Sequence, residues 1–254
     1  MSSPRISYSL AVHNSAAYLE GNVLRLEARL RDFPGSEILL IENGSSDESP
    51  HISEQLARAV HPEGVTVRTE SVARGYGNAH RRGLALARGD LVVMVGADLP
   101  FGFSDLDEWL ALDTPPALVL GSKAHAGSRV QVARSRRLLS AGFRVARRCL
   151  LGIGAGDTQG SVLISGDLAR QLAPRLACAG FLVTTEVVAL ARGLGVEARE
   201  VPVDYPGPLS PSTVRPMADS ARMLLGLFAI RRRLRQDRAA RISARAHPPA
   251  VRRP

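Results

Sequence analysis

Cysteine is scarce in this sequence, which has only Cys149 and Cys178 among its 254 residues. Two cysteines cannot form a disulfide framework, and no Cys-x-x-Cys or Cys/His cluster indicates a zinc site. The N-terminus lacks the apolar run of roughly 7 to 15 residues that a secretory signal needs. The longest apolar stretch, residues 223–230, is far short of the ~20 residues of a membrane-spanning helix. We therefore expect a cytoplasmic protein without a transmembrane helix.

The charge is distributed unevenly along the chain. Residues 1–214 carry 22 basic and 22 acidic residues, whereas residues 215–254 carry 11 basic and 2 acidic residues, which accounts for the net charge of +9. A neutral body with a cationic tail indicates that the body does the chemistry and the tail meets a lipid surface or a nucleic acid. No aromatic residue is interleaved in the basic tail, so we do not expect a nucleic-acid partner.

Hydrophobic residues make up 45% of the sequence, enough to bury a full core. In the first 122 residues, short runs rich in Val, Ile and Leu alternate with segments of helical periodicity. This alternation predicts an α/β fold with a mostly parallel sheet covered on both faces, whose ligands bind at the carboxyl ends of the strands. The predicted strands are 6–12, 37–43, 65–71, 91–97 and 117–122, and the predicted helices are 16–33, 49–60 and 77–88.

The second half alternates less regularly. It predicts helices at 134–151, 167–176 and 185–194, strands at 160–165 and 197–205, and then a proline-rich loop. We expect one domain over 1–214, with a nucleotide-binding half at about 1–122 and an acceptor half at about 123–214. An amphipathic helix at 215–236 and a disordered basic tail at 237–254 are predicted to follow. Ser49 before Pro50, and Ser104 with Asp107, are read as helix caps.

Three segments at predicted strand ends carry unusual residues: ENGSSDES at 42–49, ARGYGNAHRRG at 73–83 and GADLP at 96–100. Their order and spacing resemble family 2 glycosyltransferases of the GT-A fold, where the pieces read roughly DDGSxD, NxGxGxAxxxG and DADLP. In the second half, GSK, RRLLS, GDTQGS, GF followed by a later Glu, REVPV and STV extend the match. That wider set is similar to the dolichyl or polyprenyl phosphate sugar synthases, and the resemblance covers about residues 6–214.

The resemblance implies a Rossmann-like GT-A enzyme that moves a sugar, with inversion, from a nucleotide diphosphate donor to a polyprenyl phosphate. Asp98 matches the last Asp of the family's Asp-x-Asp motif and is the candidate catalytic residue and metal ligand. A divalent cation, Mg²⁺ or Mn²⁺, held by carboxylate oxygen neutralises a leaving diphosphate. The first Asp of the motif is Gly96 here, so the ion is expected to be weakly held. Alternatively, Asp98 only caps the turn before Pro100.

The resemblance also assigns donor-binding residues. Glu42 and Asn43 replace the family's Asp-Asp at the base and ribose, although Asn43 with Gly44 is equally a turn signal. Val12 and Asn14 belong to the segment that matches the family's Pro-Ala-Tyr-Asn.

Glycines at a helix start allow a phosphate to approach free N–H groups. Gly75 and Gly77 are placed in this way by the sequence. Arg74, just before them, either reaches a phosphate or is an exposed loop charge.

Acceptor binding is expected from the second half. Six arginines and no acid lie between residues 134 and 148. Arginine suits an anionic acceptor, and the resemblance singles out Arg136 as catalytic; the alternative is a solvated basic helix. The other residues that the resemblance assigns to the substrate are Lys123, Asp157, Gln159, Glu186 and Ser212. For Asp157, Gln159 and Glu186 the alternative is a structural role in capping or hydrogen bonding.

The last helix joins an apolar block to a run of arginines. Such a segment lies in a membrane interface or docks on the body of the protein. Two other functions remain open. A soluble hydroxyl acceptor would require a carboxylate base such as Glu186 or Asp157, and the change at Gly96 allows a degenerate relative that only binds a nucleotide sugar.

Overall fold

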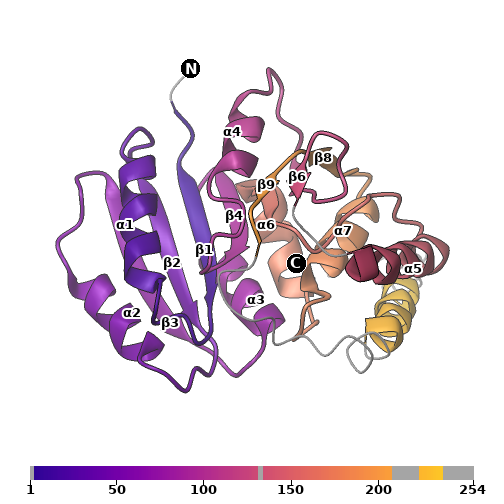
Figure 1. Ribbon diagram of the computed structural model, residues 1–254, viewed down its shortest axis with the longest axis horizontal. Coiled ribbons are helices and arrows are strands. Elements are labelled where there is room, and N and C mark those ends of the chain that lie inside the picture. The colour runs from indigo at the N-terminus through magenta and orange to yellow at the C-terminus, as the bar shows by residue number, and fades with distance from the viewer. Residues whose placement is uncertain (1–2, 131–133, 208–222, 237–254) are drawn as a thin grey trace, which may run out of the picture.

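The computed structural model describes residues 3–130, 134–207 and 223–236; within it, the side chains of 134–141 are not described. The chain forms a twisted central sheet with helices on both faces (Figure 1). The N-terminal half occupies one end of the molecule, and α5 (Arg134–Leu151) lies at the other end beside the C-terminal helix of residues 223–236.

The main sheet has seven strands in the order β3-β2-β1-β4-β7-β5-β8. Only β7 runs against its neighbours β4 and β5, so the predicted mostly parallel sheet is confirmed. A separate parallel pair joins β6 to β9. The strands are β1 (Ile6–Val12), β2 (Ser36–Glu42), β3 (Val65–Ser71), β4 (Leu91–Gly96), β5 (Leu118–Gly121), β6 (Arg129–Val130), β7 (Val162–Ser165), β8 (Arg199–Val201) and β9 (Asp204–Tyr205).

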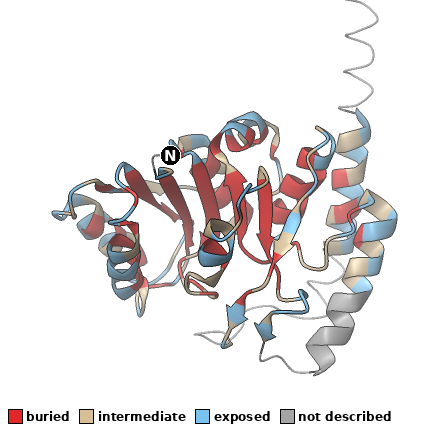
Figure 2. Cartoon of the chain, turned by 90° about the horizontal axis from the view of Figure 1, so that it is seen from above, coloured by how far each residue is buried: buried red, intermediate tan, exposed pale blue. Residues whose placement is uncertain are grey.

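Two hydrophobic clusters, one on each face, hold helices against the sheet (Figure 2). Along β4, for example, Leu91 and Val93 face one cluster, while Val92 and Met94 face the other, as expected for a strand buried on both sides. Besides α5 and the C-terminal helix, the helices are α1 (Leu19–Leu30), α2 (Ser49–Arg58), α3 (Tyr76–Leu86), α4 (Ser104–Leu110), α6 (Gly166–Leu172), η1 (Ala173–Arg175) and α7 (Val183–Arg192). Helices α1, α2 and α4 contribute to the cluster that contains Leu91, and α3, α6 and α7 to the cluster that contains Val92.

The predicted elements of the sheet are present, with shifted ends. The strand predicted at 197–205 is divided into β8 and β9 around Pro202, which has no N–H for a strand ladder. The cap predicted at Ser104 is wrong, because Phe103 precedes α4 and the Ser104 hydroxyl donates to the Phe101 carbonyl instead. Ser49 likewise lies inside α2, where its hydroxyl accepts the Ser15 N–H.

The C-terminal helix packs on the body of the protein. Leu227 and Ile230 are 0% and 1% exposed and belong to the same core cluster as α7. Of the two readings of this segment, docking is therefore observed for its inner face. No helix among the described residues combines the length and the apolar character needed to cross a bilayer. The tail predicted at 237–254 lies outside the described residues.

Candidate functional site

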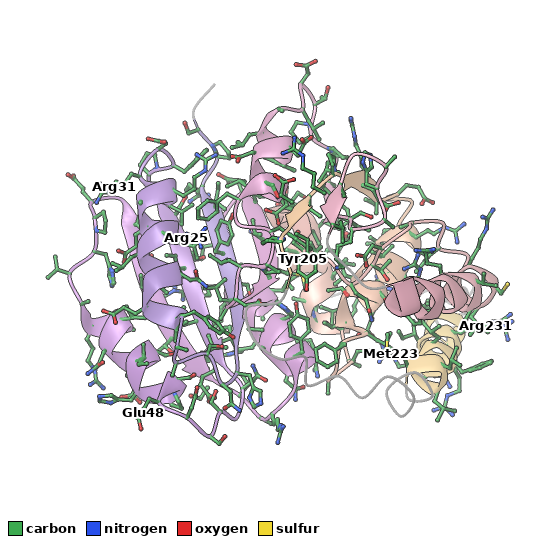
Figure 3. The ribbon with its side chains drawn as sticks, viewed as in Figure 1. Arg25, Arg31, Glu48, Tyr205, Met223 and Arg231 are labelled. Carbon is green, nitrogen blue, oxygen red and sulfur yellow. The ribbon has the colours of Figure 1, made fainter. Side chains whose placement is uncertain are left out.

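A cavity of about 680 Å³ opens beside the carboxyl end of β4. Three of the residues predicted from the sequence line it, Asp98, Lys123 and Gln159. Figure 3 labels two further lining residues, Tyr205 in front of the sheet and Met223 at the start of the C-terminal helix. The other lining residues are Tyr76, Val95, Gly96, Pro100, Phe101, Gly160, Ser161, Cys178, Ala179, Gly180, Phe181, Leu182, Thr184 and Gly226.

Asp98 supplies the carboxylate of this cavity. It follows β4 on a tight turn, in which Leu99 adopts a φ of 43° and donates its N–H to the Gly96 carbonyl. Burial raises the pKa of Asp98, while the positive charge of Lys123 acts in the opposite direction. A half-buried carboxylate beside a cavity is suited to binding a cationic group.

Lys123 supplies the ammonium group. It follows β5, and its Nζ lies 2.9 Å from the Asp157 carboxylate, 5.2 Å from the ring centre of Phe101 and 5.9 Å from that of Tyr205. Burial alone would raise the pKa of Asp157, but Lys123 holds it below its usual range. Asp157 also accepts the Gln159 N–H. These contacts fix the ammonium group at the cavity wall.

Aromatic side chains form another wall. The rings of Tyr76 and Phe181 lie 5.3 Å apart, and Tyr76 also meets His80 edge-on at 4.3 Å. Burial raises the pKa of Tyr76 and lowers the pKa of His80 to about 3, so both rings are neutral near neutral pH. This wall can stack on a planar or apolar ligand group.

The residues predicted at the donor loops mostly hold one another. The Asn43 side chain donates to the Val12 carbonyl at 2.7 Å and accepts the Gly75 N–H at 3.3 Å. Glu42 accepts the Ser45 N–H at 2.5 Å. Val12 itself is 0% exposed and contributes only backbone. These contacts support the turn reading of Asn43 and give the loops after β1, β2 and β3 a common scaffold.

Asn14 has a similar bridging role. It adopts a φ of 49°, and its side-chain oxygen accepts the Ser46 N–H at 2.8 Å. Its backbone N–H donates to the Ser45 hydroxyl. Asn14 is itself exposed. It therefore ties the loop after β1 to the loop after β2.

Gly75 and Gly77 allow a close approach, but the group that approaches is protein backbone. A Cβ on Gly75 would overlap the Ala179 carbonyl, and one on Gly77 would overlap the Cys178 carbonyl. The Gly77 N–H donates to Ala179 O at 2.8 Å. This N–H is therefore already used by the 178–180 loop, and phosphate binding by the two glycines remains a prediction. Arg74 is exposed on the adjoining loop.

Of the residues predicted to bind the acceptor, some lie at the cavity and others do not. Gln159 lines the cavity, and its side-chain amide lies 3.9 Å from Met223 Sδ. Glu186 is 0% exposed and is not part of the cavity lining, so in this structure it does not face a substrate in the cavity. Arg147, one of the six arginines, is also buried and donates to Thr158 at 2.7 Å. Ser212 and the side chain of Arg136 lie outside the described residues.

The described residues offer few protein ligands for a divalent cation. Among the described residues, no group of three His, Cys, Asp or Glu side chains is placed to hold a metal ion. Mg²⁺ is commonly held by one or two carboxylates together with substrate phosphates and waters. Asp98 alone therefore fits an ion that arrives with a diphosphate, and not one held by protein ligands only.

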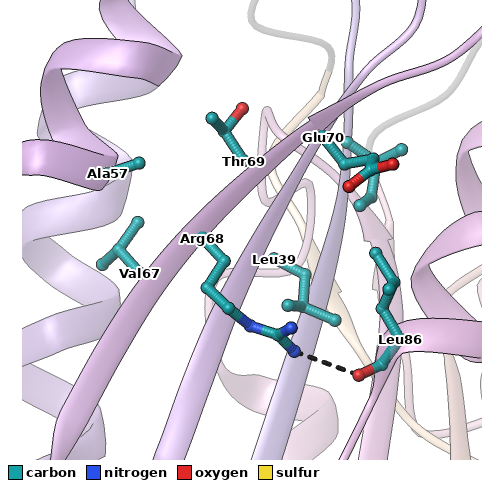
Figure 4. A pocket seen from close by; sticks show the side chains of 8 residues that line it. Leu39, Ala57, Val67, Arg68, Thr69, Glu70 and Leu86 are labelled. Atoms are coloured by element: carbon teal, nitrogen blue, oxygen red, sulfur yellow. Dashed lines mark hydrogen bonds between the residues drawn. The ribbon is translucent and has the colours of Figure 1, made fainter.

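A smaller cavity of about 340 Å³ lies on the face of β2 and β3 (Figure 4). Arg68 crosses it, donating to the Leu86 carbonyl at 3.0 Å and pairing with Glu37. It contains none of the predicted site residues.

Sequence reasoning assigned no role to the aromatic residues of the main cavity or to the 178–182 loop. Tyr205 carried one usable signal, since it ends a predicted strand just before Pro206. Phe181 and Tyr76 carried none, because an aromatic residue in a loop or at a helix start is common to many folds.

Known proteins resemble this chain in sequence and in structure. A dolichyl-phosphate β-glucosyltransferase of Trichomonas vaginalis is 29% identical over 201 residues, covering 74% of this chain and 58% of that protein. The human dolichyl-phosphate β-glucosyltransferase is 26% identical, covering 66% and 55%. This chain thus spans less than two thirds of the length of these relatives.

Among solved structures, glucosyl-3-phosphoglycerate synthase of Mycobacterium tuberculosis in complex with UDP superposes with a TM-score of 0.61. Its sequence identity is 21%, and the match covers 91% of this chain and 80% of that one. The same enzyme with Mn²⁺, UDP-glucose and phosphoglyceric acid gives a TM-score of 0.61. At this identity the likeness shows the fold, and it confirms the expected GT-A architecture.

The family itself follows from the sequence match. Residues 9–160 match the family described as glycosyl transferase family 2. That range includes the strand ends that carry Asn43 and Asp98 as well as the loop of Asp157. Because the match extends over more than half of the chain, this chain belongs to glycosyl transferase family 2.

Proposed function

We propose that this chain transfers a sugar from a nucleoside diphosphate donor to a polyprenyl phosphate, with UDP-glucose as the first donor to test. The observation that carries the proposal is the cavity in which the Asp98 carboxylate and the Lys123 ammonium group lie between aromatic walls. The names of the dolichyl-phosphate β-glucosyltransferases support the glucosyl group and the lipid acceptor. The UDP-glucose complex of the structural neighbour supports the nucleotide.

The donor side requires neutralisation of the leaving diphosphate. Asp98 is the residue that would hold a divalent cation carried in with the donor, and such a cation stabilises negative charge on the leaving group. Lys123 adds a fixed positive charge that Asp157 orients. Both groups are held before substrate binds, so little reorganisation is needed as charge develops.

The acceptor side favours a phosphate over a hydroxyl. A hydroxyl acceptor needs a carboxylate base, but Glu186 is fully buried and Asp157 is paired with Lys123. A phosphate acceptor is already ionised near neutral pH, so alignment and charge neutralisation suffice. Direct attack by that phosphate opposite the leaving diphosphate gives inversion. Arg136 is the proposed partner of the acceptor phosphate.

An anionic membrane surface is the proposed site of the reaction. On the C-terminal helix, Leu224, Leu225 and Phe228 are 41%, 71% and 56% exposed, and Arg231 and Arg232 follow within one turn. These five residues form what we call the lipid-facing surface. Figure 3 shows Arg231 on the outer side of the molecule. Exposed apolar side chains next to arginines suit peripheral binding to anionic lipid.

A transfer assay tests this function. Radiolabelled UDP-glucose with Mn²⁺ is incubated with undecaprenyl phosphate in detergent, with 3-phosphoglycerate, or with no acceptor. We expect label in the organic extract only with the lipid, and a loss of it in Asp98→Asn. Transfer to 3-phosphoglycerate alone would overturn the lipid acceptor and retain the transferase.

A nucleotide-sugar-binding relative without activity is the second candidate. It is favoured by one observation, the replacement of the motif's first carboxylate by Gly96. It predicts that UDP-glucose raises the melting temperature while no labelled product forms with any acceptor or donor of a panel. The same assay therefore separates the two candidates.

A further inference from the structure

Glu186 is the most completely enclosed carboxylate near the cavity, and the proposed function gives it no chemical step. It lies on the first turn of α7 and is 0% exposed. Its two oxygens accept the N–H groups of Ala177 at 3.1 and 3.2 Å and of Cys178 at 2.7 Å. A buried carboxylate needs such partners, because burying an unpaired charge destabilises the fold by its desolvation penalty, which is on the order of several kcal/mol per ion.

The remaining partner of Glu186 comes from the C-terminal helix. Arg233 forms an ion pair with Glu186. Burial raises the pKa of the Cys178 thiol, and the positive charge of Arg233 acts in the opposite direction. Leu227 and Ile230, on the same helix, are buried in the core beside α7. Arg233 therefore lies on a helix whose inner face is packed in the core.

The segment held by this pair is the loop that closes one side of the cavity. Cys178 and Ala179 line the cavity, and Ala179 accepts the Gly77 N–H at the start of α3. Gly75 lies against the same carbonyl and is itself held by Asn43. A continuous set of contacts thus runs from Arg233 through Glu186 and the loop to the predicted donor glycines.

We infer that Glu186 and Arg233 act together as positioning residues that hold the 177–180 loop in place as one wall of the cavity, against Gly75 and Gly77, and so set the affinity for the donor nucleotide. The inference rests on the proposed function for the identity of the donor. The loop contact itself does not depend on that function. A base role for Glu186 would leave Arg233 without effect on donor affinity.

The test uses the two cysteines as reporters. Cys149 is exposed on α5, so Cys149→Ser leaves Cys178 as the single thiol. In that background, the double variant Glu186→Gln/Arg233→Gln removes both charges without leaving one buried alone. We expect N-ethylmaleimide to label Cys178 about 10-fold faster, because the loop opens more often. Arg235→Gln, an exposed position on the same helix, is the matched control and should label within about twofold of the parent.

Calorimetry with UDP and Mn²⁺ tests the second half of the inference. The double variant should weaken UDP binding about 10-fold, and in the transfer assay it should raise the donor KM more than it lowers kcat. Arg233→Lys, which retains the charge, should recover part of the affinity.

The outcomes are separable. Unchanged labelling in a folded double variant overturns the loop contact. Faster labelling with unchanged UDP affinity overturns the link to the donor site, and a kcat loss confined to Glu186→Gln, with Arg233→Gln unaffected, assigns the carboxylate to the chemistry. If the parent protein binds no nucleoside diphosphate, the proposed function fails while the labelling result still decides the loop contact.

Discussion

The Asp98 carboxylate occupies the space beside Gly96, where a Cβ would lie 2.5 Å from Asp98 Oδ1. In the Asp-x-Asp motif, the space beside the first position, Gly96, is therefore occupied by the carboxylate of the third position, Asp98. Since the crowding atom is the end of a flexible side chain, Asp98 can turn away if a larger residue is introduced. This arrangement leaves one carboxylate where two would hold an ion more tightly.

Gly96→Asp is expected to strengthen Mn²⁺ binding in the presence of UDP by about 10-fold, because a second carboxylate joins the ligand set. Titration calorimetry measures this directly. Gly96→Ala, which introduces the Cβ without the carboxylate, should show no gain. Equal affinities in the parent and Gly96→Asp would mean that the site has been reshaped for a different ligand.

Asp98→Asn is expected to weaken UDP binding with Mn²⁺ by about 10-fold or more. The same change should raise the melting temperature near neutral pH, because burial raises the pKa of Asp98 and its ionised form destabilises the fold. The gain should shrink as the pH falls through the raised pKa of Asp98 and vanish below the ordinary value of 3.8, where the carboxyl is neutral in both states. A pH-independent difference in melting temperature would contradict this account.

Lys123→Met removes the cation between Phe101 and Tyr205. Asp157 then loses the interaction that lowers its pKa, so the variant should be less stable near neutral pH by about 1 to 3 kcal/mol. The deficit should disappear as the pH falls through the lowered pKa of Asp157, because the protonated acid gains nothing from Lys123. Denaturant unfolding at several pH values measures it.

The control for Lys123 is Arg129→Met. The Arg129 side chain is 86% exposed and lies 3.9 Å from Asp204. Its loss should change the free energy of unfolding by less than about 0.5 kcal/mol, as for other exposed pairs. UDP affinity should fall in Lys123→Met and not in Arg129→Met.

Leu225→Ser/Phe228→Ser tests the lipid-facing surface. Each apolar side chain contributes up to about 1.5 to 3 kcal/mol when fully buried, so the double variant should largely lose co-sedimentation with phosphatidylglycerol vesicles. Val60→Ser, which alters a side chain that is 99% exposed in the other half of the molecule, should bind as the parent does. Equal pelleting with phosphatidylglycerol and phosphatidylcholine vesicles would refute charge-assisted binding.

A truncation after residue 236 separates the tail from the docked helix. It removes the last basic residues but keeps Leu227 and Ile230 in the core, so melting temperature and UDP binding should be unchanged while vesicle binding becomes weaker. Removal of residues 215–254 is expected to destabilise the fold, since it exposes the surface that these two side chains cover and leaves Glu186 without Arg233. Thermal unfolding of the two truncated forms compares them.

The sequence by itself determined the order of strands and helices, the mostly parallel sheet and the position of Asp98 at the end of β4. Those features follow from local periodicity and from the rule that parallel strands place their carboxyl ends at one edge. Lys123 and Gln159 were also found from sequence, through the resemblance of short motifs to one family.

Only the tertiary structure decided which polar residues face the cavity. Glu186 and Arg233 are 47 positions apart. The sequence allowed a solvated basic helix for residues 134–148, whereas in the fold Arg147 is buried and donates to Thr158. Helical periodicity indicates that the C-terminal helix has an apolar side, but that side can be buried equally well in a protein core or in a lipid surface. The choice was made by the apolar side chains of the core cluster that includes α7, and that surface forms only when the chain has folded.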